Sequence, residues 1–194
     1  MLWILVLRLF QSLVVRGYFS PDEYWQSLEV AHSMVWGYGY LTWEWRDWQL
    51  RSIVHPLFFG VFYWALKLLG LDYPLVVAYG PRVLMGFIMF ASDCLVFKTA
   101  KLMFSESVAK KALVLSAGSW FLGYAGVRTY SNSFELLFTS LAVYYYIQAK
   151  DTQFNLSVGA ACMLRPTSIM PWVPVYLHTL FSEPKRLLST TCVG

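Results

Sequence analysis

Six apolar runs constrain the fold of this chain more than any other feature of its sequence. They cover residues 2–15, 53–71, 74–97, 112–127, 134–149 and 156–181. A membrane-spanning helix needs roughly 20 apolar residues, and these runs lack the two-residue alternation of a barrel strand. Charged residues make up only 13% of the chain, against roughly 25% in soluble domains. The runs therefore predict an all-α, polytopic membrane protein.

Basic residues between the runs predict the orientation. Seven of the fifteen Lys and Arg residues fall in three patches, which are Lys98, Lys101, Lys110 and Lys111, then Lys150, then Lys185 and Arg186. Such patches are typical of cytosolic loops. Residues 98–111 and 150–153 are therefore expected in the cytosol, and residues 16–52 and 126–133 in the lumen of a secretory membrane.

The runs 53–71 and 74–97 raise a problem of parity. If both spanned the membrane, the basic residues 98–111 would lie in the lumen. One of the two runs is then re-entrant or lies along the membrane surface, and the sequence leaves both alternatives open. The sequon at Asn155 falls at the cytosolic face or inside the membrane in this topology, so we expect it to carry no glycan.

The predicted lumenal loop, residues 16–52, is rich in aromatic residues. It holds five of the nine tryptophans, which are Trp25, Trp36, Trp43, Trp45 and Trp48. Tryptophan prefers the boundary between membrane and water, so this loop is expected to lie on the bilayer as short amphipathic helices.

Residues 21–36 suit one helix of this loop. Ser20 can cap it, and Glu23 completes a capping box. Apolar side chains recur at helical spacing on one face, at positions 24, 28, 31 and 35. Gly37 can end the helix.

The adjacent acids Asp22 and Glu23 allow two interpretations. In the first they only complement the dipole at a helix start. In the second, a carboxylate at the lip of a membrane cavity acts as a general base towards a sugar hydroxyl. The two are compatible, because one acid can cap the helix while its neighbour points into the cavity.

Four cationic or basic side chains are expected on the same side: Arg16, Arg51, His55 and Arg128. Arginine binds phosphate through two hydrogen bonds and keeps its charge, so it could meet the charge of a leaving phosphate. Alternatively, Arg16 and Arg51 anchor helix ends or pair with Glu44 or Asp47, and His55 only begins a helix. The polar segment 128–135 is either a capped turn or a wall of the same site.

Arg165 interrupts the last apolar run, just before Pro166. Arginine at that depth is costly and should face the protein interior or a cavity, unless it sits at the end of a span. Asp93 and Glu135 are both possible partners. The three cysteines are scattered and lack metal-ligand spacing, so no disulfide framework, zinc site or other metal is predicted. The net charge of +4 gives no indication of nucleic-acid binding.

Several motifs together resemble glycosyltransferase family 22, the endoplasmic-reticulum mannosyltransferases that use dolichyl phosphate mannose. The similar stretches are residues 21–30 (PDEYWQSLEV), 37–45 (GYGYLTWEW), 50–57, 128–135 and 165–167 (RPT). Residues 24–30 are most similar to the branch that adds the third, α1,2-linked mannose to a GPI-anchor precursor. Many members carry His where this chain has Ser20.

This resemblance implies a GT-C fold whose catalytic part is the first lumenal loop, and an inverting transfer. The sequence itself implies no metal. The resemblance also implies that Asp22 is the catalytic carboxylate, with Glu23 beside it. Phosphate contacts are assigned to Arg51, His55, Arg128 and Arg165, and loop contacts to Trp25, Trp43 and Trp45. The donor would be the lipid-linked sugar and the acceptor a GPI glycolipid.

Family members are much longer, so residues 1–194 are interpreted as the N-terminal part of one transmembrane domain. Three alternatives stay open, and one of them is a transporter, which the aromatic-rich loop and the carboxylate pair favour less than a lipid-linked sugar enzyme. The chain could also belong to a related enzyme of N-glycan precursor assembly, or it could be a truncated, non-catalytic membrane fragment.

Overall fold

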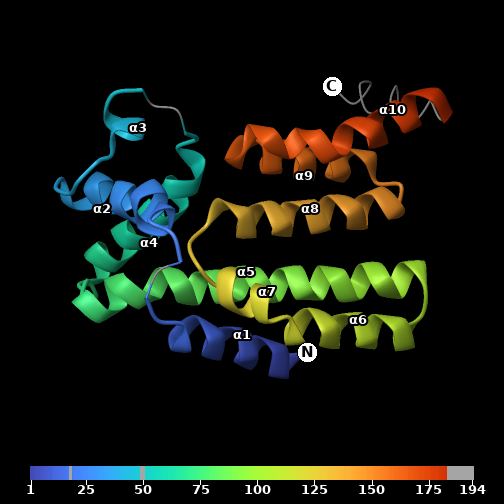
Figure 1. The fold of residues 1–194 in the computed structure, drawn as a ribbon, viewed down its shortest axis with the longest axis horizontal. Coiled ribbons are helices and arrows are strands. Elements are labelled where there is room, and N and C mark those ends of the chain that lie inside the picture. Colours follow the sequence, from blue (N-terminus) through green and yellow to red (C-terminus); the bar gives the residue numbers. More distant parts are fainter. Residues whose placement is uncertain (18, 49–50, 183–194) are drawn as a thin grey trace.

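The computed structural model describes residues 1–17, 19–48 and 51–182 (Figure 1), and this part of the chain is helical without a strand. Its N-terminal half comprises α1 (Leu2–Val14), the π-helix η1 (Tyr24–Leu28), α2 (Glu29–Trp36), α3 (Trp43–Arg46), α4 (Val54–Leu69) and α5 (Pro74–Met103). The rest comprises α6 (Glu106–Gly118), α7 (Trp120–Ala125), α8 (Ser131–Ile147), α9 (Asp151–Leu164), the 3₁₀-helix η2 (Pro166–Trp172) and α10 (Val173–Ser182).

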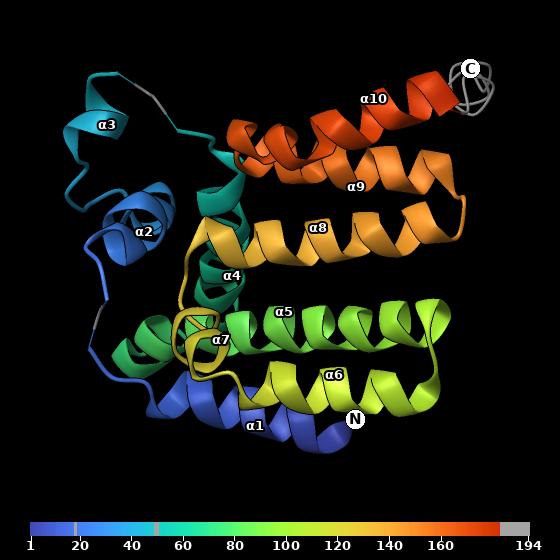
Figure 2. The ribbon, with the colours of Figure 1, turned by 45° about the vertical axis from the view of Figure 1, so that its right-hand side comes forward.

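Helix α5 is the centre of a bundle. Helices α1, α6 and α8 pack against it, and α9 packs on the far side of α8. Figure 2 shows these five helices lying lengthwise beside one another. Helix α5 is also the one helix in the described ranges that is long and apolar enough to cross a membrane; α1 and α4 are apolar but shorter.

A buried ion pair joins α1 to α5. Arg8 donates from Nε and Nη2 to the two carboxylate oxygens of Asp93, at 2.8 and 3.1 Å. Ser116 on α6 donates to the same carboxylate at 2.6 Å, and Arg8 also reaches Gln11. Both charged side chains are at most 1% exposed. The charges inside these apolar runs therefore face the protein interior.

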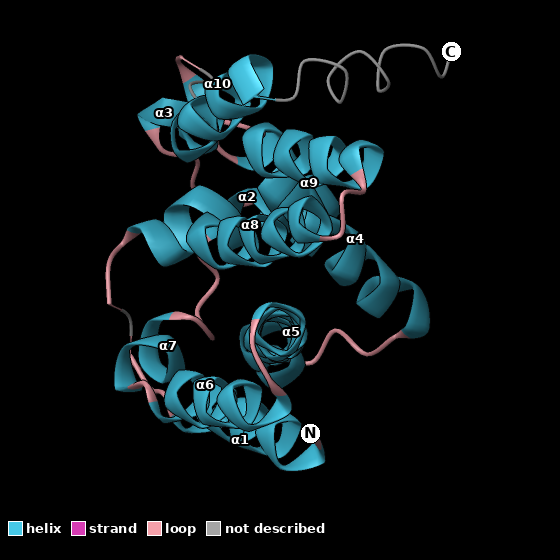
Figure 3. Ribbon diagram, turned by 90° about the vertical axis from the view of Figure 1, so that its right-hand side faces the viewer, coloured by secondary structure: helices cyan, strands magenta, loops and turns pink. Residues whose placement is uncertain are grey.

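Helix α4 lies across the bundle. In Figure 3, α5 is seen end-on while α4 extends sideways in the plane of the view. The chain enters and leaves α4 at the same end of the bundle, which also carries α2, α3 and α7 (Figure 2). We call it the loop end. This arrangement favours the surface-lying alternative for residues 53–71, with 74–97 as the lengthwise helix.

The turns with the basic patches lie at the opposite end. The α5–α6 turn and the α8–α9 turn are both on the right in Figures 1 and 2. The turn between α7 and α8 lies at the loop end. Segments 98–111 and 150–153 thus lie at the opposite end of the bundle from the described parts of 16–52 and from 126–133. The third basic patch, Lys185 and Arg186, lies outside the described residues.

The apolar runs correspond to helices with two interruptions. The run 112–127 is divided at Ser119, which ends α6 and caps α7 by accepting a hydrogen bond from the Leu122 N–H. The run 156–181 breaks at Arg165, which is extended because a residue before proline is disfavoured in helical geometry. Helix α5 continues to Met103, six residues beyond the run 74–97.

The helix predicted over 21–36 forms, with one local difference. Its side chains at positions 28 and 31 are buried in the core with those at 24 and 35 packed against them, and Gly37 ends it at φ +79°. However, residues 24–28 form a π-helical turn. The predicted capping box was wrong, because the Glu23 carboxylate turns inward to two arginines instead of back to Ser20.

Candidate active site

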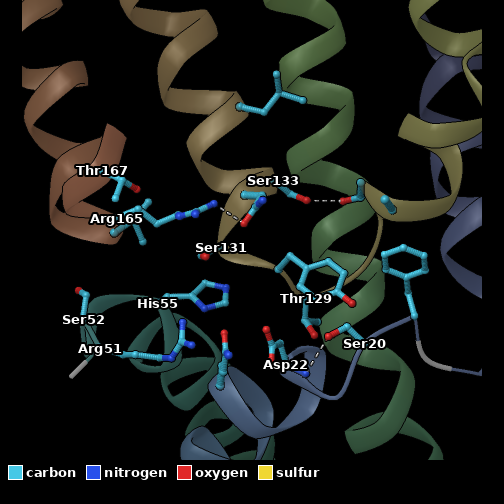
Figure 4. A pocket seen from close by; sticks show the side chains of 18 of the residues that line it. Ser20, Asp22, Arg51, Ser52, His55, Thr129, Ser131, Ser133, Arg165 and Thr167 are labelled. Atoms are coloured by element: carbon cyan, nitrogen blue, oxygen red, sulfur yellow. Dashed lines mark hydrogen bonds between the residues drawn. The ribbon is translucent and has the colours of Figure 1, made fainter. Parts of the chain in front are cut away.

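A cavity of about 640 Å³ opens at the loop end. Figure 4 shows side chains from four separate segments pointing towards one space. These segments are the start of the 21–36 helix, the beginning of α4, the turn before α8, and the break between α9 and η2. The polar lining residues are Ser20, Asp22, Gln26, Arg51, Ser52, His55, Thr129, Tyr130, Ser131, Asn132, Ser133, Arg165 and Thr167.

The other part of the lining is apolar. It comes from α7, from the facing ends of α8 and α9, and from Phe19, which precedes the 21–36 helix. Phe121, Leu122 and Leu136 belong to this side. The cavity therefore offers polar contacts and an apolar wall side by side, which suits a ligand with a polar head and an apolar tail.

Asp22 supplies the one carboxylate among the described residues that line the cavity. It is solvent-exposed. Its backbone N–H is 3.4 Å from the Ser20 hydroxyl, a long hydrogen bond that leaves the carboxylate uninvolved. Asp22 is thus held at a helix start with its side chain at the cavity, as general-base chemistry requires.

Glu23 has the opposite environment, although it is the next residue. Its side chain is 0% exposed and accepts from Arg128 at 2.7 Å and from Arg82 at 3.4 Å. It is absent from the cavity lining. Glu23 is therefore an internal anchor in this structure and cannot reach a ligand in the cavity directly.

Arg128 is equally buried, at 0% exposed. Besides Glu23, it donates to the Gly17 carbonyl at 3.0 Å, and its guanidinium lies 4.4 Å from the centre of the Tyr124 ring. The structure does not bring this predicted phosphate contact to the cavity. The backbone carbonyl of Arg16 accepts a hydrogen bond from Arg128.

Arg51 lines the cavity while paired with Glu44. Its Nε and Nη2 donate to the Glu44 carboxylate at 2.8 and 3.0 Å, and this hydrogen bonding holds the pKa of Glu44 below its ordinary value. Both sequence interpretations of Arg51 therefore remain compatible, since a guanidinium has five N–H donors and this pairing uses two of them.

His55 lines the cavity from the first turn of α4 and is buried at 6% exposed. Its ring makes edge contacts with Phe59 and Phe134. Among the described residues its Nε2 has no hydrogen-bond partner. This environment disfavours a charged imidazole, so His55 suits a hydroxyl ligand better than a phosphate.

Arg165 resolves the choice between its two possible partners. It donates to Glu135 at 3.0 Å and to the Asn132 side chain at 2.5 Å, while Asp93 pairs with Arg8. Ser168 donates to the other oxygen of Glu135 at 2.6 Å. This network joins the 128–135 segment to the 165–167 segment at the cavity wall.

The three predicted loop tryptophans have different positions. Trp45 lines the cavity. Trp25 is 38% exposed and contacts Tyr40 edge-on, and Trp43 is 56% exposed. Neither of these two lines the cavity.

The sequence pattern assigns no functional role to Arg82, which in the structure lies against the start of the predicted lumenal loop. It lies in α5 directly after Pro81 and bonds to Glu23, Tyr24 and two backbone carbonyls. A charge inside an apolar run was the available signal, because such a charge must find partners in the protein interior. The pattern could not identify those partners.

A concave cavity between packed helices, with a few polar groups beside an apolar wall, is the typical arrangement of a small-molecule binding or active site. The chain belongs to the Alg9-like mannosyltransferase family, whose model matches residues 1–193.

Named relatives are similar along almost the whole chain. A mouse protein, GPI alpha-1,2-mannosyltransferase 3, is 37% identical over 191 residues, covering 96% of this chain and 35% of the relative. GPI mannosyltransferase 3 of Drosophila melanogaster is 40% identical over 189 residues, covering 96% and 32%. Mannosyltransferase APTG1 of Arabidopsis thaliana is 34% identical, covering 96% and 35%. The chain thus spans about a third of these relatives' length. No solved structure matches it.

Proposed function

We propose that this chain is the catalytic N-terminal part of a mannosyltransferase of GPI-anchor biosynthesis. Mannose would pass from dolichyl phosphate mannose to a GPI precursor, as the third, α1,2-linked residue, in the lumen of the endoplasmic reticulum. The relatives named for this activity support the reaction class. A multi-pass GT-C arrangement belongs to the same proposal, with the lengthwise helices as membrane segments and the loop end in the lumen.

The single observation that carries the catalytic assignment is the position of Asp22, the carboxylate on the described cavity wall. In the proposed step, Asp22 accepts the proton of the acceptor hydroxyl as its oxygen bonds to C1 of mannose. The bond from C1 to the phosphate oxygen breaks, and dolichyl phosphate leaves with the electron pair. Attack opposite the leaving group converts the β-linked donor into an α-linked product.

The polar and apolar parts of the lining support the binding of different parts of the lipid-linked donor at different places in the cavity. Arg51 and Arg165 each have N–H groups beyond those used by Glu44 and Glu135, and they would meet the phosphate charge. His55 would contact a sugar hydroxyl. The apolar wall around Phe121 and Leu136 would face the start of the dolichyl chain.

Asp22→Asn tests the proposal in cells that lack GPI mannosyltransferase 3. There this chain would replace the matching third of the Drosophila relative, and GPI precursors and surface GPI-anchored protein would be measured. We expect the unsubstituted chimera to restore the third mannose. Loss of the base should reduce transfer by about 10²- to 10⁴-fold, so the two-mannose precursor accumulates.

Asp47→Asn is the matched control, because Asp47 is an exposed acid of the same loop, paired with Arg46 and absent from the cavity lining. It should retain full transfer. Full transfer by Asp22→Asn would remove the catalytic assignment. Failure of the unsubstituted chimera to rescue the GPI defect, together with its rescue of cells that lack a mannosyltransferase of N-glycan precursor assembly, would instead support the related acceptor class.

The proposed transfer needs no metal, since arginines meet the phosphate charge. Microsomes that contain the chimera should therefore transfer mannose to the GPI precursor at an unchanged rate after treatment with EDTA. Loss of transfer that is restored by added Mg²⁺ or Mn²⁺ would contradict this part of the proposal.

A further inference from the structure

Arg82 holds the segment that precedes Asp22 as well as the segment that follows it. Its Nη1 donates to the Val15 carbonyl and its Nη2 to the Gly17 carbonyl, both at 2.8 Å. The same Nη2 lies 2.8 Å from the Tyr24 hydroxyl and 3.4 Å from the Glu23 carboxylate. One guanidinium on the central helix thus contacts residues on both sides of Asp22.

The backbone directly after Asp22 is held from a second direction. The Glu23 carbonyl accepts from the hydroxyls of Thr129 and Ser27, at 2.9 and 2.8 Å. It belongs to the turn that opens into π-helical geometry, a feature that frequently marks functional sites. The position of the Asp22 backbone is consequently fixed by α5 and by the turn before α8, two elements distant in sequence.

The charge balance among Glu23, Arg82 and Arg128 shows which of these side chains can be removed with the least disturbance to the fold. Glu23 and Arg128 form a close pair at 2.7 Å, and both are fully buried. Arg82 adds a second guanidinium to the same carboxylate at the longer distance of 3.4 Å. Without Arg82 the close pair stays matched, whereas without Glu23 two buried arginines lose their carboxylate. Arg82 is therefore the member whose removal least disturbs the charge balance.

We infer that Arg82 is a positioning residue for the reaction, acting through Glu23, Tyr24 and the 15–17 backbone to aim Asp22 into the cavity. This inference rests on the proposed function of Asp22. Arg82 itself is absent from the cavity lining and has no contact with the ligand in this assignment. Its effect should accordingly fall on the rate of transfer and spare the binding of the donor.

Arg82→Leu tests the inference in microsomes that contain the chimera, with the rate of transfer and the KM for dolichyl phosphate mannose measured per amount of folded protein. A misplacement of about 1 Å at a reacting group costs about 100-fold in rate. We expect kcat to fall by about 10- to 100-fold while KM stays within about twofold. Tyr24→Phe, which removes one of the Arg82 contacts, should lower kcat less.

Arg82→Lys and Ser116→Ala separate positioning from general stability. Lysine keeps the charge but not the planar fork of donors, so it should recover only part of kcat. Ser116→Ala removes a bond to Asp93 in the α1–α5 ion pair, away from the cavity lining, and should lower thermal stability with kcat unchanged.

Unchanged kcat in Arg82→Leu would overturn the inference. So would a parallel loss of kcat and thermal stability in Arg82→Leu and Ser116→Ala, because that result would assign Arg82 a structural role alone. The proposed function is tested separately by Asp22→Asn. If Asp22→Asn abolishes transfer while Arg82→Leu does not alter it, only the positioning inference fails.

Discussion

Two neighbouring acids illustrate how one helix start serves structure and chemistry together. Successive residues of a helix point about 100° apart, so Asp22 and Glu23 cannot face the same environment. Asp22 faces the cavity, and Glu23 faces two buried arginines. The start of the 21–36 helix therefore places one carboxylate at the cavity and the other in the protein interior, where it anchors the segment.

Glu23→Gln is predicted to destabilise the protein strongly. The change leaves Arg82 and Arg128 buried without a carboxylate, and breaking a buried ion pair from one side costs about 3–5 kcal/mol. We expect a lower melting temperature in detergent and less folded protein in the membrane. Asp22→Asn should melt at the temperature of the unsubstituted protein, because its carboxylate is exposed. Equal melting temperatures for both variants would contradict the anchoring role.

The sequence predicted which residues line the cavity better than it predicted what each of them does. It predicted Asp22, Arg51, His55, Trp45 and Arg165, which all line the cavity. It could not separate lining residues from buried ones, because the adjacent acids have the same chemistry and differ only in direction. It also could not choose a partner for Arg165, since pairing depends on which helices meet in space.

At the scale of elements, the pattern of apolar positions predicted helices well where one face is clearly buried. The 21–36 helix and its end at Gly37 are examples. The π-helical turn within it was not predictable, because the apolar positions of the sequence keep ordinary α-helical spacing through it. At that turn the Glu23 carbonyl accepts a local hydrogen bond from Ser27 and a tertiary one from Thr129, and the tertiary contact is invisible in a single sequence.

The packing of α1 on α5 depends on charge balance as well as on apolar contact. Asp93→Leu should destabilise the protein by about 3–5 kcal/mol, because Arg8 would stay buried without its partner. The double variant Arg8→Leu with Asp93→Leu should recover most of this loss. Thermal unfolding of the single and double variants in detergent measures the coupling. Strictly additive effects would contradict a direct interaction between the two side chains.

At the scale of the whole molecule, the orientation rule and the apolar runs would agree if the crosswise helix α4 lies along the membrane surface. Hydropathy alone cannot distinguish a surface-lying helix from a spanning one when both are apolar. Helix α4 lies crosswise to the lengthwise helices, so it would run along the membrane if those helices cross it (Figure 3). Its exposed side chains include Leu57, Val61, Trp64 and Leu68, which share one face by their spacing.

Single cysteines on either side of α4 test this topology in a background where the native cysteines are replaced by serine. Asp47→Cys precedes α4 and Asp72→Cys follows it, and Glu106→Cys and Lys150→Cys lie at the opposite end of the bundle. In sealed microsomes, an impermeant maleimide should label only Glu106→Cys and Lys150→Cys. Both loop-end cysteines should react after permeabilisation, because α4 returns the chain to the side it left. Labelling of Asp47→Cys and Asp72→Cys from opposite sides would show that α4 crosses the bilayer, and would move the start of α5 away from the side that carries Asp22.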